Sequence, residues 1–237
     1  QAIPLSYEEG RRDVEVGDFD GNGVPDVAVS SQDGDAVQIF LGSPQGSSIL
    51  FDDSAEPILE LTQDGSAIEA SFRSPRALAA ADFDLDGTGR TDLAVLVVEA
   101  RDPLLKLYVS TGDGLTFRLQ DQLAFGDAEI DTGAALEALD GASFERSDGE
   151  AIDPHPDLLL NRQSRVSKIL VTGGADGRVK LANYAQSSGP DVRKPVSPAF
   201  IQLPRGGEKD DSLWDIACVD AASGTVATVY SDENDGI

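Results

Sequence analysis

Two stretches of the chain share one pattern, DFDGNGVPDVAV at residues 18–29 and DLDGTGRTDLAV at residues 84–95. Each begins with a loop in which acidic or polar residues alternate with other residues and glycine occurs twice. Each then continues from an aspartate into an aliphatic run. Short aliphatic runs bounded by turn residues are typical of buried β-strands. The pattern therefore predicts, twice in the chain, a tight acidic loop that leads directly into a strand.

The aspartate before the aliphatic run recurs at a nearly constant interval. Asp26, Asp92 and Asp157 are separated by 66 and 65 residues, and Asp157 leads into the run LLL. A fourth, partial copy at residues 214–236 keeps the apolar runs. Equal intervals of this length indicate a repeat architecture. We place the whole chain, residues 1–237, in one domain with units at 11–72, 73–130, 131–205 and 206–237, the last of them incomplete.

Each unit contains several short strand-like runs separated by Gly- and Asp-rich turns. Repeats of about four strands are typical of propeller blades packed around a channel. The sequence thus predicts an all-β chain, a β-propeller with blades of four-stranded antiparallel sheets. A competing interpretation places a helical turn within Asp127–Leu139, which is rich in helix-forming residues. With three units and a fraction, we expect part of a longer propeller; closure with about four blades is the alternative.

The two acidic loops carry oxygen atoms at the spacing of a cation site. In the first loop (residues 18–26), positions 1, 3, 5 and 9 offer side-chain oxygens and position 7 offers a carbonyl: Asp18, Asp20, Asn22, Asp26 and Val24. In the second loop (residues 84–92), the same positions are Asp84, Asp86, Thr88, Asp92 and, for the carbonyl, Arg90. An all-oxygen ligand set of this size favours calcium over magnesium. We therefore predict two calcium sites.

The loops allow two other interpretations. An EF-hand needs a bidentate acid at position 12, where this chain has Val29 and Val95 within strand-like runs, so that interpretation fails. Solvated hairpin turns remain the alternative, because Asp and Gly favour tight turns without any metal. Thr88 is a poorer ligand than Asn22, and Asp82, two residues before the second loop, could compensate for it.

The pattern DxDGxGxxD followed by aliphatic residues resembles the FG-GAP or VCBS-type repeat of integrin α-subunit propellers and many secreted bacterial proteins. The resemblance implies that each loop joins the first two strands of a blade and holds calcium through the ten residues named above. The literal FG and GAP sequences are absent, which places the chain nearer the bacterial VCBS-like branch. The third unit departs from the pattern, with a longer segment at residues 141–156, and the fourth has Ala221, Ala222 and Ser223 in place of ligands.

Composition excludes several classes of function. Lys and Arg total 18 against 43 Asp and Glu, for a net charge of −25, so binding to nucleic acid through a basic surface is not expected. No apolar run is long enough to span a membrane, and a single cysteine rules out an internal disulfide. The only histidine is His155, and no GxSxG motif occurs, so we predict no catalytic residues.

These observations predict a non-catalytic, calcium-binding interaction module for a protein or glycan partner, or a subunit of a larger surface assembly. We expect it to be secreted, displayed at the cell surface or periplasmic, because sites with a dissociation constant on the order of 10⁻⁴ M would be empty at cytosolic calcium concentrations. The alternative is the propeller portion of a secreted carbohydrate-active enzyme, a lyase or a hydrolase.

Overall fold

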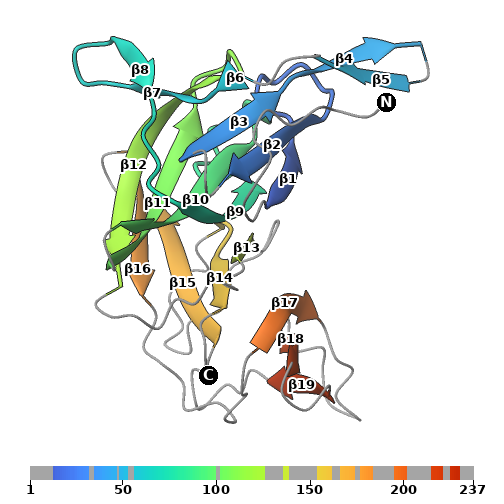
Figure 1. Cartoon of the computed structure of the whole chain (residues 1–237), viewed down its shortest axis with the longest axis vertical. Helices are drawn as coiled ribbons and strands as arrows, with labels where there is room; N and C mark the ends of the chain where they lie inside the picture. Colours follow the sequence, from blue (N-terminus) through green and yellow to red (C-terminus); the bar gives the residue numbers. More distant parts are fainter. Residues whose placement is uncertain are drawn as a thin grey trace.

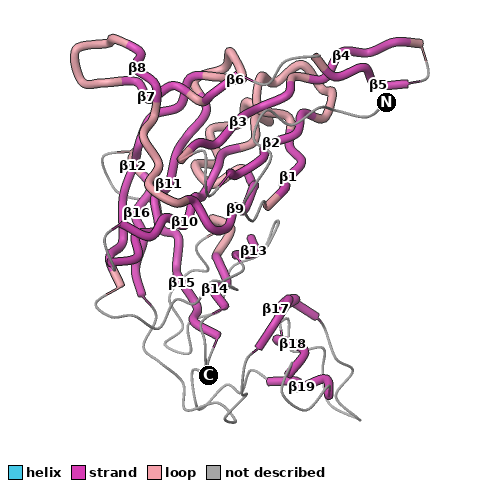
Figure 2. The backbone as a smooth tube through the Cα atoms, in the orientation of Figure 1, coloured by secondary structure: helices cyan, strands magenta, loops and turns pink. Residues whose placement is uncertain are grey.

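The computed structural model describes the following residues: 13–31, 35–46, 48–52, 56–99, 102–125, 136–138, 154–161, 166–173, 177–183, 195–201, 215–220 and 225–229. They form β-strands joined by loops (Figure 1), and none of them lies in a helix (Figure 2). In this part of the chain there is accordingly no helix that could cross a membrane. The predicted all-β class is confirmed.

The first sheet is antiparallel and has the strand order β1-β2-β3-β6. Its strands are β1 (Val14–Gly17), β2 (Asp26–Ser31), β3 (Ala36–Phe40) and β6 (Glu56–Pro57). The first loop connects β1 to β2, as expected. Between β3 and β6 the chain forms a separate hairpin of β4 (Gly42–Gln45) and β5 (Ser48–Phe51), which projects from the rest of the molecule in Figure 1.

The second sheet departs from the expected four antiparallel strands. Four of its strands are antiparallel neighbours: β9 (Pro75–Ala81), β10 (Asp92–Glu99), β11 (Asp102–Ser110) and β12 (Thr116–Ala124). The connection from the first unit adds two more strands, β7 (Leu59–Leu61) and β8 (Ala67–Glu69). β7 pairs with β12 in parallel, so this sheet has six strands in the order β8-β7-β12-β11-β10-β9.

The third sheet is antiparallel and consists of β13 (Leu136–Ala138), β14 (Leu158–Asn161), β15 (Val166–Gly173) and β16 (Val179–Asn183). The fourth has three strands, β17 (Pro195–Ile201), β18 (Asp215–Asp220) and β19 (Thr225–Val229). Of the stretch proposed as a competing helical turn, Leu136–Ala138 is strand, and residues 127–135 and 139 lie outside the described residues.

Two apolar cores join successive sheets. One contains Ala28 and Ile39 of the first sheet together with Leu78 and Val95 of the second. The other contains Leu96 of the second sheet with residues of the third, among them Leu136, Leu158 and Ile169. The second sheet is therefore buried on both faces. This explains why the run Leu93–Val97 is apolar without alternation, since each of its residues faces one of the two cores.

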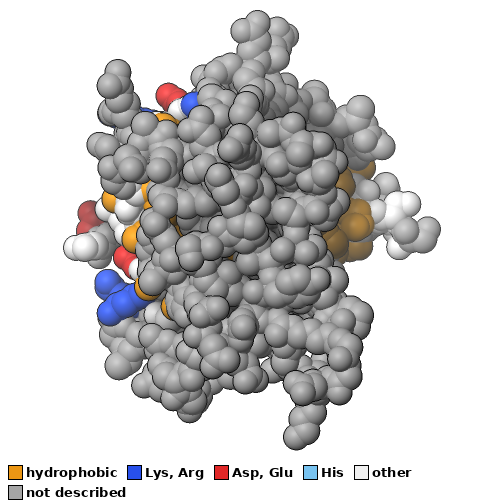
Figure 3. All heavy atoms as spheres, turned by 90° about the horizontal axis from the view of Figure 1, so that it is seen from below, with side chains coloured by type: hydrophobic (Ala, Val, Ile, Leu, Met, Phe, Trp, Pro, Cys, Tyr) orange, Lys and Arg blue, Asp and Glu red, His pale blue; other side chains and the backbone are white. Residues whose placement is uncertain are grey.

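The fourth sheet contacts the third, since β17 approaches β14. The first three sheets thus pack face to face through these two cores, and the described residues do not close into a ring. The blades of a propeller stay a prediction. Single large apolar side chains are exposed on the projecting hairpin, where Ile49 and Leu50 are 42% and 43% exposed. Figure 3 shows apolar side chains at the surface on the side to which this hairpin points.

Candidate metal centre

Backbone N–H groups hold the carboxylates of the first loop in place. Asp18 accepts hydrogen bonds from the backbone N–H of Asn22 (3.0 Å) and of Gly23 (2.8 Å), and Asp20 accepts one from Asn22 (3.0 Å). In this tight loop the backbone has a positive φ at Gly21 (75°) and Gly23 (81°). Residues other than glycine adopt such a φ only at a cost in free energy. The loop sequence therefore specifies its own shape.

This curl gathers three carboxylates. Asp18, Asp20 and Asp26 each offer an oxygen, and these atoms lie within 4.8 Å of one another. Asn22 is beside them, but its Nδ2 donates to Asp20 Oδ2 (2.9 Å) and its Oδ1 accepts from Val24 N (2.7 Å). The first loop thus unites the three predicted carboxylates, while the amide oxygen of Asn22 is turned to the backbone.

The second loop gathers a different trio. Here the carboxylates within 4.8 Å of one another belong to Asp82, Asp84 and Asp86. Asp82, at the end of the first strand of the unit, takes part in the trio, and Asp92 is not a member of it. The three are half-buried or exposed. The structure therefore keeps two of the predicted carboxylates together and adds the aspartate that could compensate for Thr88.

Arg90 and Thr88 distinguish the second loop further. Arg90 forms an ion pair with Asp86 (2.8 Å), and the hydroxyl of Thr88 donates to the same carboxylate. Partial burial acts to raise the pKa of Asp86, but the bonds from Thr88 and the charge of Arg90 outweigh it, so that the pKa is lowered. The guanidinium thus supplies positive charge that the first loop lacks.

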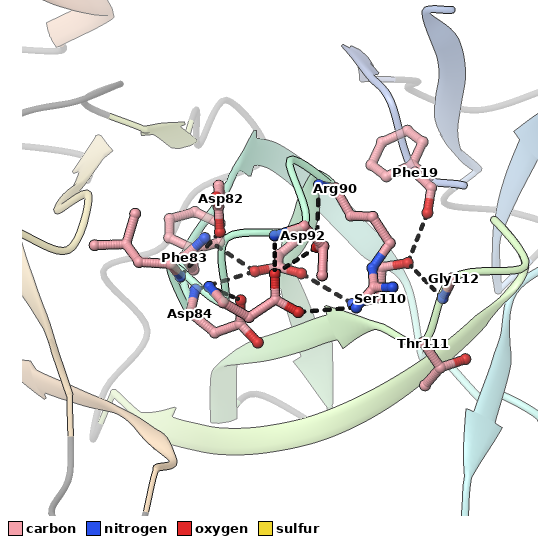
Figure 4. Close-up of polar contacts among 12 residues, drawn as sticks. Phe19, Asp82, Phe83, Asp84, Arg90, Asp92, Ser110, Thr111 and Gly112 are labelled. Atoms are coloured by element: carbon pink, nitrogen blue, oxygen red, sulfur yellow. Dashed lines mark hydrogen bonds and ion pairs between the residues drawn. The ribbon is translucent and has the colours of Figure 1, made fainter. Parts of the chain in front are cut away.

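The aspartate at the start of the second strand is buried in all three units. Asp26, Asp92 and Asp157 are 0%, 2% and 1% exposed. Asp92 Oδ2 accepts from Phe83 N (2.9 Å) and Asp84 N (3.2 Å), and its Oδ1 accepts from Ser110 N (2.9 Å) (Figure 4). These bonds tie the loop and the end of β11 to the start of β10.

The other two units repeat the arrangement. Asp26 accepts from Phe19 N (2.8 Å) in its own loop and from Gly42 N (2.7 Å) just beyond β3. Asp157 accepts from Val171 N (2.8 Å) in β15. A buried carboxylate needs such donors to compensate for lost hydration. The third unit therefore keeps the buried aspartate although its loop lacks the acidic pattern.

Burial and repulsion between neighbouring charges raise the pKa of several of these carboxylates. Desolvation raises the pKa of Asp92 to about 8, opposed by the N–H of Ser110 and reinforced by the charge of Asp84. Burial likewise raises the pKa of Asp26, against the bonds from Gly42 and Phe19, and that of Asp84, with added repulsion from Asp86. A divalent cation between such groups would favour their charged form.

The two loops touch each other directly. Asp18 N donates to Thr91 Oγ1 (3.0 Å), and Thr91 N donates to the carbonyl of Asp18 (2.8 Å). Ser110 Oγ donates to the carbonyl of Phe19 (2.6 Å), as Figure 4 shows. The approach requires Gly17, because a Cβ there would lie 2.5 Å from Thr91 Cγ2. No pattern in the sequence indicates this contact, because it joins residues of different units.

Comparisons with known proteins add no assignment. No protein-family model matches the chain, and no curated protein matches it. The resemblance to FG-GAP and VCBS-type repeats therefore stays a prediction that rests on the loop pattern and the repeat interval.

Proposed function

We propose that the chain is a calcium-stabilised β-propeller-type module that works outside the cytoplasm and binds a protein or glycan partner, alone or as a subunit of a surface assembly. One observation carries the proposal. Two clusters of three carboxylates occur at the same place in successive units, before β2 and before β10. Three neighbouring carboxylates repel one another, and a simple turn does not need them. Their occurrence in two successive units therefore favours a role in binding a cation.

The chemistry of the clusters supports calcium. All the donors are oxygens, and each cluster concentrates three carboxylates within 4.8 Å. Hard cations prefer such ligands, and calcium tolerates the irregular number and geometry that a loop of this kind provides. Bound calcium would offset the repulsion that contributes to the raised pKa of Asp84 and Asp26. The loops would then hold the strands that they connect more firmly.

The stacking of the sheets supports the propeller-type arrangement. The second sheet shares one core with the first sheet and another with the third, and each of these sheets has at one edge the strand that precedes the acidic loop or its equivalent. The net charge of −25, with 18 Lys and Arg against 43 Asp and Glu, favours a partner other than nucleic acid.

The test is thermal unfolding of the full chain in excess chelator and then in a calcium titration. With a dissociation constant on the order of 10⁻⁴ M and about 1 mM calcium, each site contributes roughly 1.4 kcal/mol. Two sites should raise Tm by about 5 to 10 °C. The double variant Asp18→Asn with Asp84→Asn should lose most of this rise, because asparagine keeps the shape of the side chain and removes its charge.

Asp52→Asn is the matched control, since Asp52 is exposed and lies outside both clusters. It should respond to calcium as the native chain does. A native chain whose Tm is the same in chelator and in calcium would reduce both loops to turns and remove the basis of the proposal. Turnover of an acidic polysaccharide by the double variant would instead favour the carbohydrate-active alternative.

A further inference from the structure

Asn22 is the only asparagine of the sequence that precedes a glycine. The other three precede residues with side chains: Asn161, Asn183 and Asn234. An Asn-Gly pair is chemically reactive, because the backbone nitrogen of the glycine attacks the side-chain Cγ of the asparagine, a five-membered succinimide ring closes and ammonia leaves. Glycine favours this attack, since it has no side chain in the way and its backbone is the least restricted. The pair at positions 22 and 23 is therefore the candidate site of such a reaction.

The first loop leaves this pair accessible. Asn22 and Gly23 are both exposed, and Gly23 has a φ of 81°. A Cβ built on Gly23 would have no atom within 4 Å, whereas a Cβ on Gly21 would lie 2.9 Å from Arg90 Cγ. No neighbouring atom therefore crowds that side of Gly23 when its nitrogen moves toward the side chain of Asn22, and water has access to the product ring.

Three hydrogen bonds surround the amide of Asn22 with the groups that the reaction needs. Gly23 N, the nucleophile, donates to Asp18 Oδ2 (2.8 Å), which is the distance at which a general base accepts a proton. Asn22 Oδ1, on which negative charge develops during the attack, accepts from Val24 N (2.7 Å). Asn22 Nδ2, the leaving group, donates to Asp20 Oδ2 (2.9 Å). The loop thus holds a base, an oxyanion donor and a leaving-group partner around one amide.

We propose that Asn22 is a self-deamidation site, at which Gly23 N attacks Asn22 Cγ and Asp18 acts as the general base. As the new C–N bond forms, the proton of Gly23 N passes to Asp18 Oδ2. The Cγ–Nδ2 bond then breaks, and the nitrogen takes up a proton and leaves as ammonia. Water opens the succinimide at either of its two carbonyls, which leaves aspartate or isoaspartate at position 22. The net reaction consumes one water and releases one ammonia, and it needs no oxidant or cofactor.

The second loop already has an acid at the equivalent position. Thr88 N donates to Asp86 Oδ1 (2.8 Å) as Val24 N donates to Asn22 Oδ1, and a glycine with positive φ follows in both loops. Deamidation to aspartate would therefore give the first loop the carboxylate that the second loop encodes. Isoaspartate would instead lengthen the backbone of the loop by one methylene. The inference rests on the geometry of the loop around Asn22 and is independent of the proposed calcium sites.

The first experiment compares the full chain, folded and unfolded in guanidinium chloride, during incubation in chelator. Mass spectrometry of peptides follows the amide at Asn22, and fragmentation separates aspartate from isoaspartate. We expect the folded chain to convert Asn22 faster than the unfolded chain, because unfolding separates the base and the oxyanion donor from the amide. Asn161 and Asn183 are internal controls and should keep their amides in the folded chain. A folded chain that keeps the amide of Asn22, or converts it more slowly than the unfolded chain does, overturns the proposal.

Asp18→Asn tests the general base, because it keeps the shape of the side chain and removes its carboxylate. It should slow the conversion of Asn22 roughly a hundredfold. Asp52→Asn is the control, since Asp52 is exposed and lies outside the loop, and it should convert at the native rate. An Asp18→Asn variant that converts at the native rate overturns the role of Asp18. If this variant does not fold, the comparison of folded and unfolded native chain decides the proposal without it.

Discussion

At the scale of single residues, one aspartate type combines two tasks. Asp26, Asp92 and Asp157 all accept backbone N–H groups at the start of a second strand, and Asp26 also belongs to a carboxylate cluster. The structural task is present in all three units, whereas a cluster is present in two of those described. The aspartate at this position therefore has a structural role in all three units, and a candidate cation site lies beside it only where further acidic residues are present.

The raised pKa values predict how stability depends on pH. In the unfolded chain Asp92 titrates near the ordinary value of 3.8, and in the folded chain desolvation raises its pKa to about 8. Between these values the folded state binds more protons, so the free energy of unfolding should fall as pH rises. Asp13, Asp26, Asp82 and Asp84 act in the same direction; the lowered pKa values of Asp64, Asp86 and Asp113 act in the opposite one.

Urea unfolding in chelator at about pH 5 and about pH 8 measures this dependence. The chain should be more stable at the lower pH. In saturating calcium the difference should shrink or change sign, because calcium competes with protons for the same carboxylates. Asp92→Asn should flatten the profile in chelator. Greater stability at about pH 8 than at about pH 5 in chelator would contradict the prediction.

At the scale of the elements, the third unit separates the structural aspartate from the acidic loop. Its Asp157 is 1% exposed and accepts a hydrogen bond from Val171 N, but it follows His155 and Pro156 in place of the acidic motif. The β14–β15 pair is therefore held by the same bond as β2–β3 and β10–β11 without a described carboxylate cluster beside it. A strand pair of this type does not depend on a cation for its position.

Asp157→Ala tests this separation. The variant leaves Val171 N buried without its acceptor, which should cost about 1 to 3 kcal/mol of unfolding free energy. The cost should be the same in calcium and in chelator. The measurement is urea unfolding under both conditions, with Asp52→Ala as an exposed control. A cost for Asp157→Ala that appears only in calcium would place a cation site in the third unit.

At the scale of the whole molecule, the second sheet couples its neighbours. One of its faces shares a core with the first sheet and the other shares a core with the third. Direct hydrogen bonds between the two loops add a polar link at the first of these interfaces. Because neither neighbour can lose the second sheet without exposing a core, we expect the three sheets to unfold together.

Two core variants test this coupling. Leu78→Ala truncates a fully buried side chain of the first core, and Leu96→Ala does the same in the second. Each should cost about 2 to 5 kcal/mol and lower the midpoint of one common transition. Calorimetry together with hydrogen exchange of β2 and β15 measures it. Ile68→Ala, on the exposed hairpin, should have little effect, and two separate transitions in either core variant would contradict the coupling.

Much of this architecture was predictable from the sequence because it depends on local interactions. The strands follow from aliphatic runs between turns, and the first loop follows from bonds between near neighbours, such as Asn22 N to Asp20 Oδ1. The interval of the aspartates predicted that Asp157 would be equivalent to Asp26 and Asp92, and its burial and its bond to β15 are like theirs. Two of the three carboxylates in the second cluster were also identified in this way.

The tertiary structure alone decided the features that join residues distant in sequence. The parallel pairing of β7 with β12, the contact between Asp18 and Thr91, and the burial of the second sheet on both faces all depend on how one unit packs on the next. The same packing left Asp92 outside the second cluster. A sequence pattern records which face of a strand is apolar, but the partner of that face is chosen by packing over the whole chain, where shape and hydrogen bonds of many residues act together.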